Sequence, residues 1–132
     1  MLKRKQMTDA TREVLERLQV SVPDFNSVVG LMSGGQRQAV AVSRAAAFAS
    51  KVVILDEPTA ALGVRESRKV LDLILRLRDE NRAVVVVSHA MDHVMEVSDR
   101  AVVLRGGRKV GEVVPSAETY KQIVSLIVGG GV

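Results

Sequence analysis

The stretch KVVILDEPTA, residues 51 to 60, contains an apolar run that ends in two acidic residues and a proline. A second apolar run, AVVVVS, occupies residues 83 to 88. Short runs rich in β-branched residues are typical of buried strands, and between these two the apolar residues of 64–80 recur at helical spacing. A strand, a helix and a strand in this order predict a βαβ unit with a parallel sheet. We therefore expect an α/β fold in which a crossover helix joins two parallel strands.

Further elements are predicted on both sides of this unit. Residues 8–20 have the pattern of a short amphipathic helix, and a second, alanine-rich helix is expected over 36–49. On the other side, a short helix at 91–97 precedes two apolar runs that flank Gly106-Gly107, which indicates a tight β-hairpin. A last helix is expected over 116–129, with the serine at its start as the cap and the glycine at its end as the stop.

The composition narrows the classes of protein to consider. The 132 residues suffice for one domain or part of one. The chain has no cysteine, which excludes disulfides and thiolate metal sites. Its formal charge of +4 permits an anionic partner, but most lysines and arginines are interspersed with acidic residues on expected helix surfaces. With two Phe, one Tyr and no Trp there is little surface on which bases could stack, so we expect no nucleic-acid partner.

The segment LMSGGQ, residues 31 to 36, places glycines directly before the alanine-rich helix. We call Ser33, Gly34, Gly35 and Gln36 the signature turn. One interpretation is a helix cap, in which Ser33 caps and the glycines make the turn. The other is a phosphate site, because a helix N-terminus preceded by glycine presents free backbone N–H groups to an anion. The turn alone is compatible with both.

Chemically capable side chains follow each expected strand of the βαβ unit. Asp56 and Glu57 end the first strand, and His89 follows the second. Ligands of parallel α/β sheets bind at the carboxyl ends of the strands. An aspartate there can hold Mg²⁺ through water, an adjacent glutamate can deprotonate an attacking water, and a histidine can contact a phosphate oxygen. The alternatives are a hydrogen-bonded strand-to-turn junction for the acid pair and a satisfied surface or core position for the histidine.

Taken together, these motifs resemble the nucleotide-binding domain of ABC transporter ATPases. LMSGGQ is similar to the signature loop of that family, VVILDEPTA to its Walker B strand with the catalytic glutamate, and VVVVSH to its switch-histidine segment. The resemblance runs from about Val29 to about Val114. Within the family, EPTAALGVRES and HAMDHVMEVSDRAVVLRGGRKVGEV resemble the ATPases of bacterial carbohydrate importers of the ribose and xylose type.

The resemblance implies a role for each motif, with ATP and Mg²⁺ as cofactors. Asp56 would ligate Mg²⁺ through water, Glu57 would be the general base, and His89 would sense the γ-phosphate. The signature turn would contact the γ-phosphate of a nucleotide held by a second ATPase domain, in a homodimer or a pseudodimer. The implied partners also include a transmembrane permease, which would place the chain in the cytoplasm, peripheral on the inner face of the plasma membrane.

Two departures from the family pattern affect this interpretation. The family's phosphate loop, G-x-x-x-x-G-K-[ST], does not occur in the sequence, and Gly63 stands where the family commonly has an aspartate. We therefore expect a partial P-loop NTPase fold that lacks the Walker A strand. Residues 1–132 would be the C-terminal part of a single nucleotide-binding domain, through truncation, frame disruption or a partial gene record. Residues 1–50 would end the helical subdomain and 51–132 would form part of the ATPase core.

Two functions of different classes follow from these observations. The first is a fragment of an ABC-type ATPase that couples ATP hydrolysis to the import of a sugar, inactive alone because the phosphate loop is missing. It should be marginally stable or self-associating, since an apolar edge of the sheet would be exposed. The alternative is a non-catalytic module that supplies its signature-loop face to a partner ATPase. A DNA-repair or chromosome-structure ATPase head shares these motifs, but the chain has no heptad-rich flanks.

Overall fold

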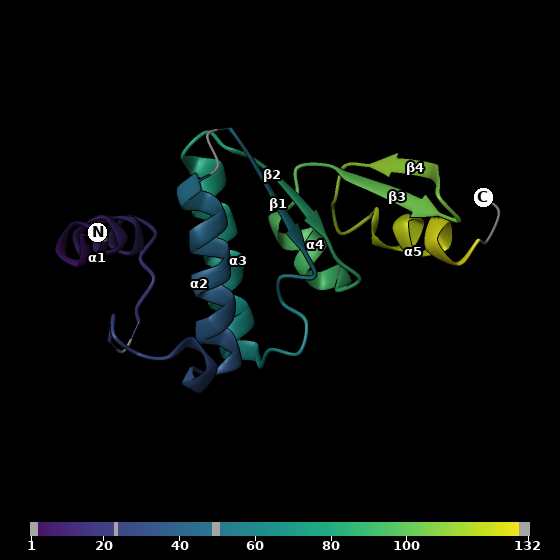
Figure 1. Cartoon of the computed structure of the whole chain (residues 1–132). Helices are drawn as coiled ribbons and strands as arrows, with labels where there is room; N and C mark the ends of the chain where they lie inside the picture. Colours follow the sequence, from purple (N-terminus) through teal and green to yellow (C-terminus); the bar gives the residue numbers. More distant parts are fainter. Residues whose placement is uncertain (1–2, 23, 49–50, 130–132) are drawn as a thin grey trace. The chain divides into compact units, whose positions relative to one another are not determined.

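The computed structural model describes residues 3–22, 24–48 and 51–129, and the chain divides after Ser88 into two compact units (Figure 1). The α/β class and the C-terminal hairpin predicted from the sequence are confirmed. The predicted division into 1–50 and 51–132 differs from that of the two units and stays a prediction. The first unit contains α1 (Arg4–Arg17), the short 3-10 helix η1 (Val29–Leu31), α2 (Gly34–Phe48), β1 (Val52–Asp56), α3 (Val64–Asp79) and β2 (Ala83–Val87). The second contains α4 (Met91–Val97), β3 (Ala101–Arg105), β4 (Arg108–Val113) and α5 (Tyr120–Val128).

The first unit is built on a parallel pair of strands. β1 and β2 pair in register from Val52 opposite Ala83 to Asp56 opposite Val87, and α3 makes the connection between them. Helices α2 and α3 lie side by side, with α2 against β1 and α3 against β2 (Figure 1). Their apolar stripes bury alternate residues of β1, because successive side chains of a strand point to opposite faces. The predicted βαβ unit is therefore present.

The opposite face of this sheet is bare within the described residues of the first unit. Val52, Ile54, Val85 and Val87 are all exposed there, and Ile54 keeps 69% of its surface in contact with solvent. The prediction that both strands are buried throughout is wrong for this structure, since the two helices that contact the strands cover the same face. The exposed apolar surface that we expected at an edge of the sheet thus extends over a whole face.

Helix α1 begins and ends earlier than its apolar pattern predicts. The residues before Thr8 are mostly good helix formers, so the helix extends back to Arg4. At the other end, Gln19 has a φ of 53°, and the N–H of Val20 donates to the carbonyl of Leu15 at 2.8 Å. The left-handed Gln19 and the hydrogen bond from Val20 back to Leu15 together form a Schellman motif, which ends the helix before residue 20.

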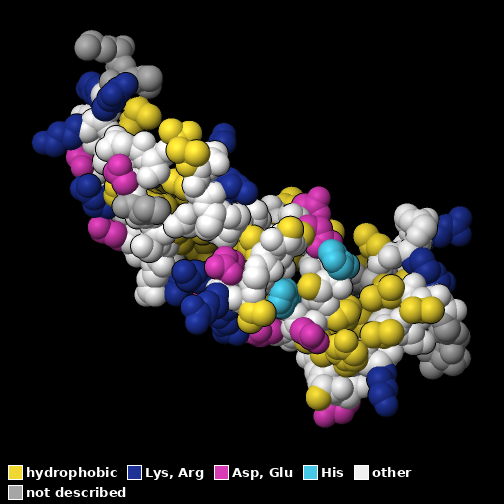
Figure 2. Space-filling model, turned by 90° about the horizontal axis from the view of Figure 1, so that it is seen from below, with side chains coloured by type: hydrophobic (Ala, Val, Ile, Leu, Met, Phe, Trp, Pro, Cys, Tyr) yellow, Lys and Arg dark blue, Asp and Glu magenta, His cyan; other side chains and the backbone are white. Residues whose placement is uncertain are grey.

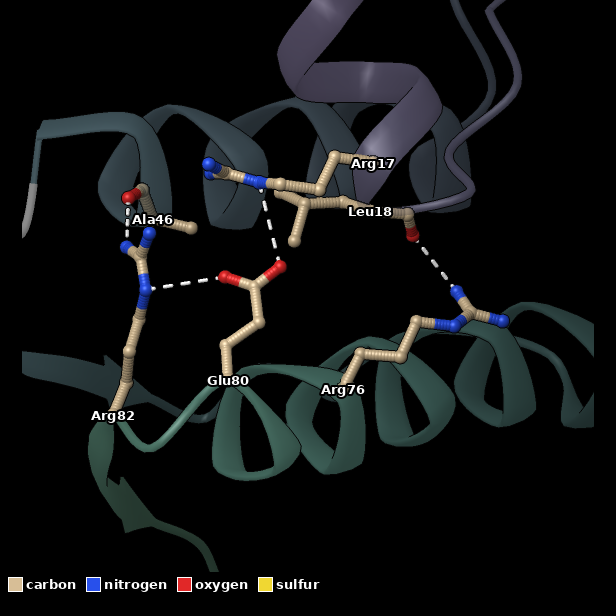
Figure 3. A network of polar contacts seen from close by, with 6 residues as sticks. All are labelled: Arg17, Leu18, Ala46, Arg76, Glu80 and Arg82. Atoms are coloured by element: carbon tan, nitrogen blue, oxygen red, sulfur yellow. Dashed lines mark hydrogen bonds and ion pairs between the residues drawn. The ribbon is translucent and has the colours of Figure 1, made fainter.

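A network of charged side chains joins the helices of the first unit (Figure 3). The carboxylate of Glu80, just after α3, lies 3.3 Å from the guanidinium of Arg17 on α1 and 3.3 Å from that of Arg82. Arg82 also donates to the backbone carbonyl of Ala46 on α2. One carboxylate therefore links α1 to the segment that leads from α3 into β2, and Arg82 extends the link to α2.

Leu18 anchors the end of α1 in the same place. Its side chain is fully buried, and its carbonyl accepts a hydrogen bond of 2.8 Å from Arg76 of α3 (Figure 3). A carbonyl at a helix end has no partner within the helix, so an arginine from a neighbouring helix is a favourable partner there. The C-terminal end of α1 is thereby held by both apolar burial and a polar contact.

The second unit is a hairpin covered by a helix. Gly106 and Gly107 have φ values of 56° and 75°, which suit the two-residue turn predicted between β3 and β4. Helix α5 packs against both strands, and Leu126 lies over Gly111, where an added Cβ would come within 2.5 Å of it. The core consists of Ala101, Val103, Val113 and Ile123.

Helix α5 starts later than the sequence predicts. Ser116 does not cap it, because its N–H donates to the hydroxyl of Thr119 at 2.8 Å within a preceding turn, and the helix begins at Tyr120. It ends as predicted at Gly129, which has a φ of 89°. Figure 2 shows hydrophobic side chains gathered on the surface of this unit over α5, where Ile127 and two valines are exposed. No helix in the described ranges is long and apolar enough to cross a membrane.

The bare sheet face predicts self-association of the chain. Replacing Ile54 by Thr should lower the average mass measured by sedimentation equilibrium, because it removes exposed apolar surface. Leu55→Thr is the matched control, since Leu55 faces the helices and is buried. It should lower the free energy of unfolding by roughly 2–5 kcal/mol. An average mass that Ile54→Thr leaves unchanged at equal protein concentration would contradict the prediction.

A pH dependence is expected from the hairpin of the second unit. Lys109 and Arg100 both donate to the carboxylate of Glu112, Arg100 at 2.9 Å, and these hydrogen bonds lower the pKa of Glu112 below the ordinary value, with Lys109 the larger cause. The pKa is then lower in the folded than in the unfolded state. The contribution to stability is present above the unfolded pKa and is lost as the pH falls through the folded pKa.

Carbon-detected NMR titration of the glutamate carboxyls measures this effect. Lys109→Met should raise the pKa of Glu112 more than Arg100→Met does. Equal shifts in the two variants, or a pKa of Glu112 that neither variant changes, would contradict the assignment.

Candidate functional site

The signature turn forms a capping box at the start of α2. The hydroxyl of Ser33 accepts the backbone N–H of Gln36 at 3.2 Å, and the side-chain Oε1 of Gln36 accepts the backbone N–H of Ser33 at 2.9 Å. Such a reciprocal pair satisfies two backbone donors at a helix start. The capping interpretation is confirmed. The helix begins at Gly34 rather than at Gln36, because the box closes around the first turn and takes both glycines into it.

The same box leaves its donors unused. Ser33 and Gln36 act in the box only as hydrogen-bond acceptors. The hydroxyl proton of Ser33 and the Nε2 amide protons of Gln36 therefore take no part in it. The first turn of α2 holds no acidic residue, and the guanidinium of Arg37 lies beside it, donating to the carbonyl of Met32 at 2.5 Å. A positive helix end with outward donors and an adjacent cation can bind an anion. Capping and anion binding are therefore compatible here.

Gly35 has a packing role that the sequence did not reveal. A Cβ at this position would lie 2.3 Å from Cγ and 2.7 Å from Cβ of Glu66 on α3. The neighbouring Gly34 is less constrained, since its nearest contact would be Leu62 at 3.6 Å. Glu66 also reaches back to the start of its own helix, where its Oε2 lies 2.8 Å from the Cβ position of Gly63. The spacing of Gly63 and Glu66 is that of a helix cap and its third residue, the signal by which Glu66 could have been found.

The acid pair lies at the carboxyl end of β1. Asp56 is exposed, and Glu57 continues the ladder by one hydrogen bond, its N–H donating to the carbonyl of Val87 at 2.8 Å. Glu57 has a φ of 48°, an uncommon conformation for a residue with a side chain, and it turns the chain sharply out of the strand. Asp56 lies on the bare face with Ile54, so this acid is exposed although the strand that it ends was expected to be buried.

The structure brings the loop after the acid pair to the signature turn. Residues 57–63 connect β1 to α3, and α3 begins next to the start of α2 (Figure 1). His89 belongs to the second unit, so the structure does not assign it a position beside Asp56 and Glu57. Its role stays a prediction, as do the roles of the acid pair and of the signature turn.

The acidic groups fit a magnesium ion only if other ligands contribute to its coordination. No cluster of three or more His, Asp or Glu side chains suited to a metal occurs in the parts of the chain that the structure describes. Mg²⁺ commonly takes one or two carboxylates and completes its shell with water and phosphate oxygens. Asp56, an exposed carboxylate at the end of a parallel strand, suits this mode. The residues therefore fit an ion that binds together with a phosphate ligand.

Comparison with known proteins finds relatives of this chain in one family. The ABC transporter family profile matches residues 2–60. The chain is 48% identical over 129 residues to the fructose import ATP-binding protein FrcA of Rhizobium meliloti, covering 97% of this chain and 50% of that protein. The chain is a relative of ABC transporter ATPases. It is also 45% identical over 107 residues to the xylose/arabinose import ATP-binding protein XylG of Sulfolobus acidocaldarius, covering 81% of this chain and 43% of XylG.

A third relative is also an import ATP-binding protein. The ribose import ATP-binding protein RbsA of Yersinia pestis is 40% identical over 129 residues, with 98% of this chain and 25% of RbsA covered. The chain thus spans half or less of the length of these relatives. All three relatives are named as import ATP-binding proteins for sugars.

Solved structures of ABC ATPases confirm the fold. The ATP-binding cassette MJ1267 matches with a TM-score of 0.79 at 23% identity, over 96% of this chain and 51% of that chain. A nucleotide-free ATP-binding cassette matches with a TM-score of 0.81 at 24% identity, over 93% of this chain and 48% of that chain. The ABC-type α/β fold predicted from the motifs is therefore present.

The two glycines of the signature turn should respond differently to alanine. Gly35→Ala should lower the free energy of unfolding by about 1–3 kcal/mol, because its Cβ would overlap Glu66 on α3. Gly34→Ala is the matched control, and its better helix propensity should change stability by at most about 1 kcal/mol, in the stabilising direction. Urea unfolding followed by circular dichroism measures both. Equal losses of unfolding free energy in the two variants would show that the contact with α3 does not require glycine at position 35.

Proposed function

We propose that this chain provides the signature turn and the Walker B residues of an ABC-type ATPase that couples ATP hydrolysis to the import of a sugar. The observation that carries the proposal is the 48% identity to a fructose import ATP-binding protein over 97% of the chain. The relatives named for xylose, arabinose and ribose import support the same class of transported molecule. A monosaccharide is therefore the cargo that we assign to the assembly.

In this proposal the signature turn binds the γ-phosphate of a nucleotide held by a second ATPase domain. The hydroxyl of Ser33 and the side-chain amide of Gln36 donate to phosphate oxygens, and the capping box supports this role because it occupies only their acceptor atoms. The backbone N–H groups of Gly34 and Gly35 lie in the first turn of α2, where backbone donors have no partner within the helix.

Asp56 and Glu57 take complementary roles at the end of β1. Asp56 holds Mg²⁺ through water, and the ion supplies neutralisation of phosphate charge when it is bound with ATP. Glu57 accepts the proton of the attacking water as general base. His89 contacts the γ-phosphate from the segment that follows β2. The sharp turn at Glu57 supports its assignment, because uncommon backbone conformations concentrate at functional sites.

The cradle for the remaining phosphates is assigned to residues outside these 132, since the sequence contains no G-x-x-x-x-G-K-[ST] motif. The assembly then consists of this chain, the segment or chain with that motif, a second ATPase domain, and a transmembrane permease. This places the chain on the cytoplasmic face of the plasma membrane through its permease.

Substitution of the general base tests the proposal. In an assembled transporter that contains this chain, Glu57→Gln should lower ATP turnover by roughly 10²- to 10⁴-fold, because the amide cannot accept the proton. Binding of ATP should persist. The matched control is Glu13→Gln, on the exposed surface of α1, which should leave turnover unchanged.

Two results would contradict parts of the proposal separately. Near-normal turnover in Glu57→Gln would remove Glu57 from the role of base. Turnover in the unmodified assembly that responds to none of fructose, xylose, arabinose and ribose, each supplied with a matching binding protein, would contradict the assignment of a sugar as cargo.

A further inference from the structure

Two glycines of the first unit lack a Cβ at the places where the side chain of Glu66 lies. A Cβ at Gly35, in the first turn of α2, would come within 2.7 Å of the Cβ of Glu66 and even closer to its Cγ. A Cβ at Gly63, the residue before α3, would come within 2.8 Å of the Oε2 of Glu66. The stem of this side chain thus packs on the signature turn, and its carboxylate reaches the end of the loop 57–63.

Neither glycine is required by its backbone conformation. Gly63 has a φ of −69° and a ψ of 169°, an extended conformation that any residue adopts. Gly35 lies within α2 and has no positive φ, and inside a helix alanine is favoured over glycine by about 1 kcal/mol. What the two positions share is the space that Glu66 occupies. The two glycines and the glutamate therefore form one packing unit.

The loop that ends at Gly63 is compact and begins with the candidate general base. The N–H of Ala60 donates to the carbonyl of Glu57 at 3.1 Å. The N–H of Leu62 donates to the carbonyl of Thr59 at 3.3 Å. A displacement of Gly63 is therefore passed to Glu57 through a short segment that is held by its own hydrogen bonds.

We propose that Glu66 is a positioning residue for ATP hydrolysis, because its side chain fixes the separation between the signature turn and the loop that follows Glu57. This inference rests on the proposed function, in which the turn binds the nucleotide of a second ATPase domain. Glu57 then serves the other nucleotide, the one that is bound with the Mg²⁺ of Asp56. The separation of turn and loop on this chain has to match the separation of the two nucleotides, and Glu66 sets it without touching either.

Variants of Glu66 separate the length of its side chain from its charge. In an assembled transporter that contains this chain, Glu66→Ala should lower kcat roughly ten- to hundredfold, the effect of a displacement of about 1 Å. The KM for ATP should change by less than about threefold, because the contacts that are lost form in the transition state. Glu66→Gln keeps the length of the side chain and should keep kcat within about threefold of the unmodified value. Glu13→Ala, on the exposed surface of α1, is the matched control and should change neither constant.

A double-mutant cycle tests the contact itself without ATP. Glu66→Ala removes the stem that a Cβ at Gly35 would overlap. Gly35→Ala should therefore lower the urea midpoint of the full chain clearly in the unmodified background and less, or not at all, in the Glu66→Ala background. Glu66→Asp, which is shorter by one methylene, replaces Glu66→Ala in both experiments if that variant does not fold or assemble.

Three outcomes would overturn the positioning role while the proposed function stands. The first is an unchanged kcat in Glu66→Ala. The second is a loss of kcat in Glu66→Gln as large as that in Glu66→Ala. The third is an effect of Gly35→Ala on the urea midpoint that is the same in both backgrounds. Failure of the proposed function is a different result, the absence of ATP turnover in the unmodified assembly, and the positioning role would fail with it.

Discussion

The close approach of α2 and α3 at Gly35 sets the geometry on which the candidate site depends. Atoms of Glu66 occupy the space that a side chain at this position would need, so the two helices can lie this close only with glycine there. Because α3 is joined to β1 by residues 57–63, the contact also fixes where this loop lies relative to the signature turn. The lack of a side chain at Gly35 thus determines how the turn at the start of α2 lies relative to the loop that follows the acid pair of β1.

At the signature turn, structural and chemical needs are met by different atoms of the same residues. The capping box requires acceptors for backbone N–H groups, and Ser33 and Gln36 provide them. An anion requires donors, and the hydroxyl and amide protons remain for that purpose. Serine and glutamine carry both kinds of atom, whereas aspartate and glutamate, which also suit capping boxes, would place negative charge at the turn when ionised. This explains why a neutral pair suits a phosphate-binding helix start.

Local sequence patterns were sufficient to predict the helices and strands. The features that the sequence did not predict depend on contacts between these elements. The apolar runs at 52–56 and 83–87 and the pair Gly106-Gly107 contain enough information for strands and a hairpin. The bare sheet face could not be predicted, since a β-branched run looks the same whether one or both faces are covered. Neither could the packing of Glu66 on Gly35, because it depends on which helix lies opposite.

The bare face also bears on the proposed chemistry. Asp56 follows Val52 and Ile54 on this face of β1, so any layer that covers the exposed valines and isoleucine also comes close to the carboxylate assigned to Mg²⁺. Covering the face would bury apolar surface and remove water around Asp56 in the same step. Electrostatic interactions strengthen as water leaves. If the phosphate-binding loop is part of that layer, the burial of apolar surface brings the parts of the site together. The same burial strengthens the charge interactions at Asp56, because it removes water.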